Sequence, residues 1–386
     1  MRDVTRMQAV QPAIIPIIAD LVRRTPGTIS LAQGVVSYGP PPGALRVLTS
    51  PLGPDVHRYG PVTGEPALVE AIAAKLAAEN GIRVGGDRRV AVTAGSNMAF
   101  GNAVLATTRP GDEVILQAPF YFNHDMAVAI AGCRTIAVPT GPGWQLRPDA
   151  IEAAITPRTR AVVTVSPNNP SGAVYDERSL RAVNALCRER GLYHVHDEAY
   201  EYFTYDDARH FSPGAIADGH AHTISLFSLS KTYGMAGWRI GYMLMPAALF
   251  EPVNKIQDTN LICPAILSQR LARAALAEGS GYCRDKVRDL DAVRRTVLAL
   301  LSHAGDRCAL TPPQGAFYCL VTVDTALSPL AIAERLITRH RVAVVPGSAF
   351  GLEAQCTLRV SYGALDRETM AEGIGRLVEG LRRECG

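Results

Sequence analysis

The sequence predicts an α/β protein, in which a three-layer large domain with a mostly parallel sheet is joined to a smaller α+β domain. The first observation is length, because 386 residues exceed what one hydrophobic core usually organises. The second is a series of short apolar runs before residue 250, with helical patterns in several of the gaps. The third is a change of pattern after about residue 250, where a long helical zone leads to further strand-like segments.

The apolar runs of the predicted large domain are hydrophobic throughout instead of alternating with polar residues. This pattern is typical of strands that are buried on both faces of a parallel sheet. Helical patterns at residues 65–79 and 176–190 separate some of these runs. Because ligands bind beyond the carboxyl ends of such strands, the residues just after each run are candidates for a functional site. The predicted strands are residues 90–93, 113–117, 135–138, 161–166, 192–196, 223–227 and 240–245.

The two ends of the chain differ from its middle. A helical zone at residues 268–304 is followed by strand-like segments. The first forty residues hold several prolines and one helical stretch at residues 16–24, which predicts an arm that crosses the surface or reaches a partner subunit. The C-terminal strand-like segments are residues 315–323, 342–345 and 358–361. The predicted division is an arm with part of the small domain (1–45), a large domain (46–285) and a small domain (286–386).

Composition argues against several classes of protein. Hydrophobic residues make up 47% and charged residues 19%, which is an ordinary profile for a protein with an ample core. The net charge of +3 is small and Lys and Arg form no continuous cluster, so we expect no nucleic-acid partner. The eight cysteines show no C-x-x-C spacing, so we expect no metal. Residues 1–6 lack a signal-peptide core and no apolar run has the length of a membrane span, so we expect a cytoplasmic protein with no membrane partner.

One lysine stands out at the end of a predicted strand. Lys231 comes after residues 223–227, with Ser228 and Ser230 before it and Arg239 eight positions later. A lysine at the mouth of a buried strand, with hydroxyls and an arginine close by, suits an amine that attacks a carbonyl beside an anionic phosphate. The segment alone is also compatible with a surface lysine after a strand.

Three other segments place polar residues just beyond an apolar run. Residues 94–99 run into a helix, where exposed N–H groups can form an anion site, although an ordinary capped turn has the same pattern. Residues 166–172 contain two prolines that fix a rigid loop and present Asn169, although a plain turn looks alike. Asp197 ends the run at 192–196, where a buried carboxylate is costly unless it is paired.

Two histidines precede this aspartate. His194 and His196 lie on one face of the predicted strand, because side chains alternate along a strand. Such a pair can indicate a metal site, but no further ligand spacing accompanies it. We therefore interpret both as core histidines.

The spacing of the candidates brings them together. Asn169, Asp197 and Lys231 lie 28 and 34 residues apart, which is about one strand-and-helix repeat each. Their side chains are therefore expected to converge on one edge of one sheet.

With these residues in order, the chain resembles a fold-type I pyridoxal 5′-phosphate (PLP) enzyme of the class I/II aminotransferase family over nearly its full length. The resemblance implies PLP as cofactor and a homodimer with shared active sites. It implies transfer of the amino group of an L-amino acid to a 2-oxo acid. The matching motifs are Asn169-Pro170-Ser171-Gly172, Asp197-Glu198-Ala199-Tyr200, Ser228-x-Ser230-Lys231, Arg239-x-Gly241, Tyr59-Gly60 with Gly64, Pro119-Phe120-Tyr121, the segment 345–351, and Arg359-Val360-Ser361-Tyr362.

The resemblance also implies roles for single residues. Lys231 would hold the cofactor as a Schiff base and then carry the proton from the substrate α-carbon. Asp197 would keep the ring nitrogen protonated, so that the ring accepts electrons. Asn169 and Tyr200 would hydrogen-bond the ring's phenolic oxygen, and Tyr121 would stack on the ring face.

The phosphate and the substrate have implied partners as well. The residues implied to hold the phosphate are Gly95, Ser96, Asn97, Ser228, Arg239 and, from the neighbouring subunit, Tyr59. Asn97 departs from the family, because many members have a longer side chain there. Arg359 would bind the substrate α-carboxylate, together with Gly34 and Asn169. The apolar loop 35–42, with Val35 and Tyr38, favours a neutral or aromatic substrate over a dicarboxylate.

The sequence leaves two alternative functions open. The same residues support a PLP-dependent lyase, cyclase or oxidase, because the motifs do not encode the fate of the carbanion that forms when the α-proton is removed. A PLP-sensing regulatory module is disfavoured, because no basic recognition helix is visible.

Overall fold

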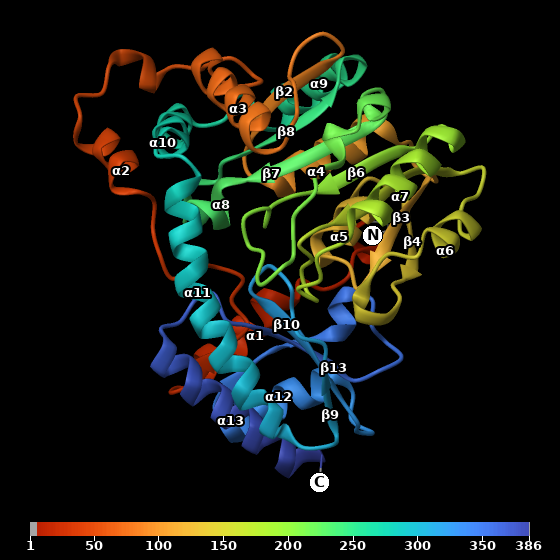
Figure 1. The fold of residues 1–386 in the computed structure, drawn as a ribbon, viewed down its shortest axis with the longest axis vertical. Coiled ribbons are helices and arrows are strands. Elements are labelled where there is room, and N and C mark those ends of the chain that lie inside the picture. The colour runs from red at the N-terminus through yellow and green to blue at the C-terminus, as the bar shows by residue number, and fades with distance from the viewer. Residues whose placement is uncertain (1–5, 386) are drawn as a thin grey trace, which may run out of the picture.

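A seven-stranded sheet in the order β2-β8-β7-β6-β5-β3-β4 forms the centre of the larger part of the computed structural model (Figure 1). The strands β7, β6, β5, β3 and β4 are parallel, whereas β8 is antiparallel to both of its neighbours. The mostly parallel sheet is therefore confirmed, and every predicted run overlaps one strand. The strands are β2 (Arg88–Thr93), β3 (Glu113–Ala118), β4 (Arg134–Pro139), β5 (Thr159–Val165), β6 (Tyr193–Asp197), β7 (Thr223–Ser228) and β8 (Gly241–Pro246).

Helices cover both faces of this sheet, which gives the three layers. Successive strand residues point to opposite faces, so Leu226 packs in the cluster with α4, α5 and α9 while Phe227 packs in the cluster with α3 and α10. The helices α6 and α7 cover the rest of the second face. The helices are α3 (Pro66–Glu79), α4 (Ser96–Thr107), α5 (Phe122–Ile130), α6 (Pro148–Ala153), α7 (Glu177–Arg190), α9 (Phe250–Leu261) and α10 (Ile266–Ala277).

A smaller, four-stranded antiparallel sheet in the order β12-β13-β10-β9 lies below the large one in Figure 1. Helix α1 (Ile14–Arg24) packs into the hydrophobic cluster formed by this small sheet and its helices, and β1 (Ile29–Ser30) pairs with β11 (Val342–Ala343). Part of the N-terminal arm therefore belongs with the C-terminal elements. The remaining elements are β9 (Cys308–Leu310), β10 (Tyr318–Val323), β12 (Val345–Pro346), β13 (Thr357–Ser361), α11 (Ser280–Leu301), α12 (Pro329–His340) and α13 (Arg367–Cys385).

The helical zone predicted for residues 268–304 divides into α10 and α11. Gly279 stands between them with φ +73°, a conformation that glycine adopts without strain and that interrupts a helix. The predicted domain boundary at residue 285 falls inside α11, the long helix that runs from the large sheet to the small one in Figure 1.

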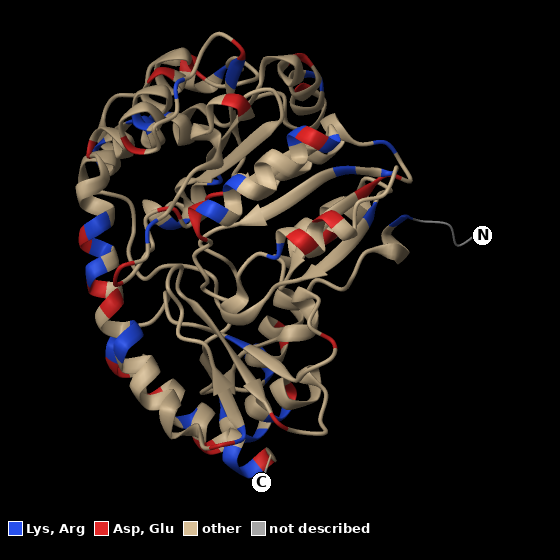
Figure 2. Ribbon diagram, turned by 45° about the vertical axis from the view of Figure 1, so that its right-hand side comes forward, with Lys and Arg blue, Asp and Glu red and all other residues tan. Residues whose placement is uncertain are grey.

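The structure describes residues 6–385. Residues 1–5, which include most of the segment expected to lack a signal-peptide core, and residue 386 lie outside the described part. Among the described helices, none combines the length and the apolar character that crossing a membrane requires. Acidic and basic residues are interspersed over the ribbon in Figure 2.

Candidate active site

A cavity of about 250 Å³ lies at the carboxyl ends of β5, β6 and β7, where the two sheets face each other. Parallel strands bring their carboxyl ends to one edge, so segments far apart in the sequence meet there. Most of the predicted residues line it: Gly34, Ser96, Asn97, Tyr121, Asn169, Asp197, Tyr200, Ser228, Lys231, Arg239 and Arg359.

Two predicted residues are not part of this lining. Gly95 lies just behind it with φ +84°, and a Cβ at this position would stand 2.7 Å from Arg239 Nη2. Glycine therefore allows Arg239 to approach the start of α4. Tyr59 is 80% exposed and lies away from the cavity of its own chain.

Lys231 reaches the cavity from a single helical turn, α8 (Leu229–Thr232), directly after β7. Its Nζ donates a hydrogen bond to the carbonyl oxygen of Gly34. Burial, with the nearby charges of Arg239 and Arg359, lowers the pKa of this amine to about 8. A substantial fraction of the amine is therefore neutral, and nucleophilic, near physiological pH.

Asp197 ends β6 with its carboxylate buried. One oxygen accepts the N–H of Ala199 at 3.0 Å, and the other lies 3.2 Å from His124 Nε2 on α5. His124 is buried too, and its ring stacks on Phe100 with the centroids 3.9 Å apart. The carboxylate thus has no permanent cation within the described residues, which leaves it free to pair with a cationic ring nitrogen.

A second end of the cavity suits an anion. Helix α4 begins at Ser96, and none of the described side chains caps its first N–H groups. Arg239 stands opposite with φ +50°, and its guanidinium donates to the carbonyl of Ala236. Within the described residues Arg239 has no carboxylate partner, so its charge and the helix N-terminus can both act on a phosphate.

Arg359 is a cation buried in the wall of the cavity. It is 2% exposed, and donates to Asn169 Oδ1 at 3.1 Å and to the carbonyl of Ala32 at 2.7 Å. Its Nε lacks a hydrogen-bond partner, and in the described part of the chain no carboxylate pairs with it. Because an unpaired buried charge is strongly unfavourable, this arginine is suited to a carboxylate ligand.

Tyrosines form the wall between these groups. Tyr200 Oη lies 2.8 Å from Tyr318 Oη, and Asn169 Nδ2 donates to Tyr200 Oη at 3.4 Å. Burial raises the pKa of Tyr200 well above its ordinary value, so the phenol keeps its proton and can donate it. A Cβ on Gly34 would lie 2.8 Å from Tyr318 Oη, which explains glycine at that position.

Sequence reasoning missed His124 and Tyr318. His124 could have been found, because it lies one helical turn after Tyr121 and the two rings meet edge to face, 5.3 Å apart. Tyr318 begins a strand that is mostly apolar, and an inward hydroxyl in such a strand leaves no periodic signal.

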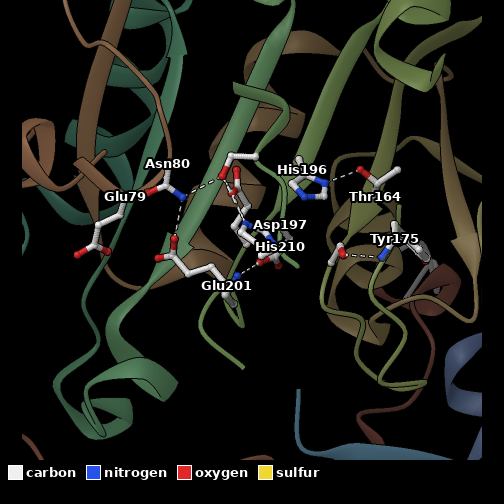
Figure 3. Close-up of polar contacts among 12 residues, drawn as sticks. Glu79, Asn80, Thr164, Tyr175, His196, Asp197, Glu201 and His210 are labelled. Carbon is white, nitrogen blue, oxygen red and sulfur yellow. Dashed lines mark hydrogen bonds and ion pairs between the residues drawn. The ribbon is translucent and has the colours of Figure 1, made fainter. Parts of the chain in front are cut away.

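A buried polar network lies on the other side of the Asp197 segment (Figure 3). Glu198 accepts from His210 Nε2 at 2.8 Å, and Glu201 accepts from Lys75 at 2.5 Å and from Asn80 at 2.8 Å. These bonds fix the loop after β6 to α3 and so hold the segment that carries Tyr200.

His194 and His196 are buried in this region. Both rings hydrogen-bond Thr164 Oγ1, at 2.8 and 2.6 Å. Burial lowers the pKa of His194 to about 3, so this ring is neutral. Over residues 6–385, no group of three or more potential metal ligands is found.

The chemistry of the lining fits PLP. An anion-binding end with Arg239, a buried carboxylate at Asp197 and an amine at Lys231 correspond to the phosphate, ring nitrogen and aldehyde of that cofactor. Arg359 remains for the carboxylate of an amino acid.

Comparisons with known proteins agree with this fit. The family model "Aminotransferase class I and II" matches residues 26–377. The chain is 37% identical to an aromatic aminotransferase of Arabidopsis thaliana, over 94% of this chain and 92% of that protein. It is 31% identical to the aspartate aminotransferase of Pyrococcus abyssi, over 98% of each. A solved single mutant of Thermus thermophilus aspartate aminotransferase has a TM-score of 0.90 at 33% identity, covering 98% of this chain and 100% of that chain.

Because the matches run through both sheets and the cavity between them, they concern the whole chain and not one motif. The chain therefore belongs to the class I and II aminotransferases, and it is a PLP-dependent transaminase of fold type I.

Proposed function

We propose that the enzyme prefers an L-amino acid with a neutral or aromatic side chain as amino donor. The observation that carries this proposal is the lining of the cavity. Its three cations, Lys231, Arg239 and Arg359, suit the cofactor and the α-carboxylate, and the described residues of this chain add no fourth cation to the lining for a side-chain carboxylate. The remaining wall has apolar and aromatic residues, namely Ile15, Val35, Phe122 and Tyr318. An aromatic aminotransferase among the relatives supports the same preference, although others are named aspartate aminotransferases.

The chemistry is derived from the positions of the residues. When bound, PLP supplies an electron-withdrawing ring that stabilises negative charge at the substrate α-carbon. We assign to Lys231 the covalent attachment of the cofactor and the transfer of the α-proton by its Nζ. Asp197 would hold the proton on the ring nitrogen, and Tyr200 would donate to the ring oxygen with Asn169. Arg359 would bind the α-carboxylate through the N–H groups that Asn169 and Ala32 leave free, including that of Nε.

A substrate panel tests this proposal. We expect kcat/KM for phenylalanine and tyrosine to exceed that for aspartate at least roughly tenfold, because an unpaired carboxylate would be desolvated in the apolar wall. Each amino acid is incubated with the purified holoenzyme, with and without a 2-oxo acid, and keto-acid product is measured. Preference for aspartate would contradict the proposed donor class, and acceptor-independent release of ammonia or uptake of oxygen would support a lyase or oxidase instead.

We further propose a homodimer in which Tyr59 serves the neighbouring subunit. Its ring is exposed and lies close in sequence to other exposed apolar side chains, Leu45, Leu48 and Leu52. Several exposed large apolar side chains along one short segment suit a surface that a partner subunit covers. We also propose a cytoplasmic location, which the eight unpaired cysteines support. The domain limits 1–45, 46–285 and 286–386 likewise remain proposals.

If Tyr59 contacts the phosphate in the neighbouring subunit, removing its hydroxyl should weaken cofactor binding. Tyr59→Phe should weaken PLP binding about tenfold without changing the sedimentation coefficient, because one hydrogen bond to a charged group contributes about that much. Cofactor affinity is measured by equilibrium dialysis and mass by analytical ultracentrifugation. Tyr193→Phe, at the half-buried amino end of β6, is the control and should bind PLP normally. A fully active monomer would refute the shared site.

A further inference from the structure

The loop at residues 34–39 is fastened to the turn that carries Lys231. Tyr38 Oη donates to the carbonyl oxygen of Lys231 at 2.9 Å and lies 3.4 Å from that of Thr232. Lys231 Nζ in turn donates to the carbonyl of Gly34. Gly234, with φ +63°, lies so close to the loop that a Cβ would stand 2.5 Å from the carbonyl oxygen of Tyr38. The loop and the turn therefore fit each other along several residues.

The hydroxyl of Tyr38 provides a hydrogen-bond donor for a carbonyl at the end of α8. Helix α8 is a single turn, and the last carbonyls of a helix have no partner within it. The carbonyl of Lys231 receives the N–H of Gly234 at 3.2 Å, which is at the long end of the usual range. The bond from Tyr38, at 2.9 Å, is shorter than the bond from Gly234 and lies well within that range.

The ring of Tyr38 is held in place from the opposite side. It packs edge to face on Tyr282, with centroids 6.1 Å apart, and Lys286 Nζ lies 5.9 Å from its centroid. Both residues belong to α11. Tyr282 also donates to the carbonyl of Gly39 at 2.7 Å, so α11 supports the loop as well as the ring.

We propose that Tyr38 is a positioning residue for Lys231 in the transamination reaction. This inference rests on the proposed role of Lys231 as the amine that attaches the cofactor and carries the α-proton. Tyr38 is not part of the cavity lining, so it acts through the backbone of Lys231. When the amine of Lys231 leaves Gly34 to do its chemistry, its own bond to the loop is lost. The hydrogen bond from the hydroxyl of Tyr38 to the carbonyl of Lys231 then keeps the turn α8 in place against the loop 34–39.

The test removes only the hydroxyl. Tyr38→Phe should bind PLP to the same occupancy as the wild type, while kcat falls about tenfold, because an amine displaced by a fraction of an ångström transfers the proton less efficiently. The deuterium isotope effect of an α-deuterated donor on kcat should rise, because proton transfer becomes more rate-limiting. In the cofactor-free protein, the amides of Gly234 and Met235 should exchange with deuterium faster.

The matched control is Tyr205→Phe. Tyr205 is buried and its hydroxyl also donates to a backbone carbonyl, that of Ala316, at 2.5 Å. This variant should keep kcat within about twofold. An equal loss in both variants would overturn the inference, as would a Tyr38→Phe enzyme with wild-type kcat and isotope effect. A wild-type protein that neither binds PLP nor turns over would instead overturn the proposed function, and this role with it.

Discussion

Lys231→Ala is expected to lower transamination roughly ten-thousandfold, because it removes both a nucleophile and a general acid–base group from the cavity. Its pKa of about 8 already sets this amine apart from an ordinary lysine. Kinetics with a saturating 2-oxo acid measure the loss. Borohydride reduction and subsequent peptide mass spectrometry show which lysine holds the cofactor.

The chain is favourable for this experiment, because it has only four lysines. Lys75 is buried in an ion pair with Glu201, and the side chain of Lys255 is 73% exposed beside Glu251. Lys255→Ala is therefore the control and should retain full activity and full labelling. Reduction that labels Lys75 or Lys286, or a Lys231→Ala enzyme with a tenth of wild-type turnover, would reject the assignment of Lys231.

Much of the cavity could be predicted from the sequence, for a geometric reason. Parallel strands end at one edge, so residues just beyond successive apolar runs must meet, and Asn169, Asp197 and Lys231 do line one cavity. The fold was predictable because strands buried on both faces are apolar throughout, and such runs differ in length and composition from the helices between them.

The rest depended on contacts that leave no pattern in the sequence. Tyr318, in β10 of the small sheet, contacts Tyr200, in the turn after β6 of the large sheet, and the sequences of these two segments do not indicate how one sheet is placed over the other. The sequence indicates Tyr38 only as part of the substrate loop, because its bond to the Lys231 carbonyl spans 193 residues. Tyr59 stays a prediction, since its proposed partner belongs to a second chain.

The second large effect is expected for Asp197→Asn, which should lower kcat on the order of a thousandfold. The amide has nearly the same shape, and it can still accept the N–H of Ala199 as the carboxylate does. What it lacks is the negative charge that would keep a ring nitrogen protonated in a buried site. The variant should therefore still hold the cofactor through Lys231, and its visible absorbance should remain while turnover is lost.

A buried carboxylate at the other end of the same sheet provides the control. Glu113 is fully buried at the amino end of β3, and hydrogen bonds from Thr156, Arg158 and Arg134 lower its pKa from 4.5 to about 2. Because this pKa is depressed in the folded state, Glu113 stabilises the protein above pH 4.5, and that stabilisation is lost as the pH falls toward 2. Glu113→Gln should therefore lower the melting temperature at pH 7 and leave kcat unchanged.

The pair of variants separates charge from folding. If Asp197→Asn acted only by loosening the sheet, Glu113→Gln would reduce kcat by a similar factor, because both remove one buried charge from the same seven strands. If the charge of Asp197 acts on the cofactor, only Asp197→Asn loses turnover, and Asp197→Glu recovers part of it by restoring the charge at a displaced position. An Asp197→Asn enzyme within tenfold of wild type would mean that the ring nitrogen needs no anionic partner here, and His124 would then be the residue to examine beside it.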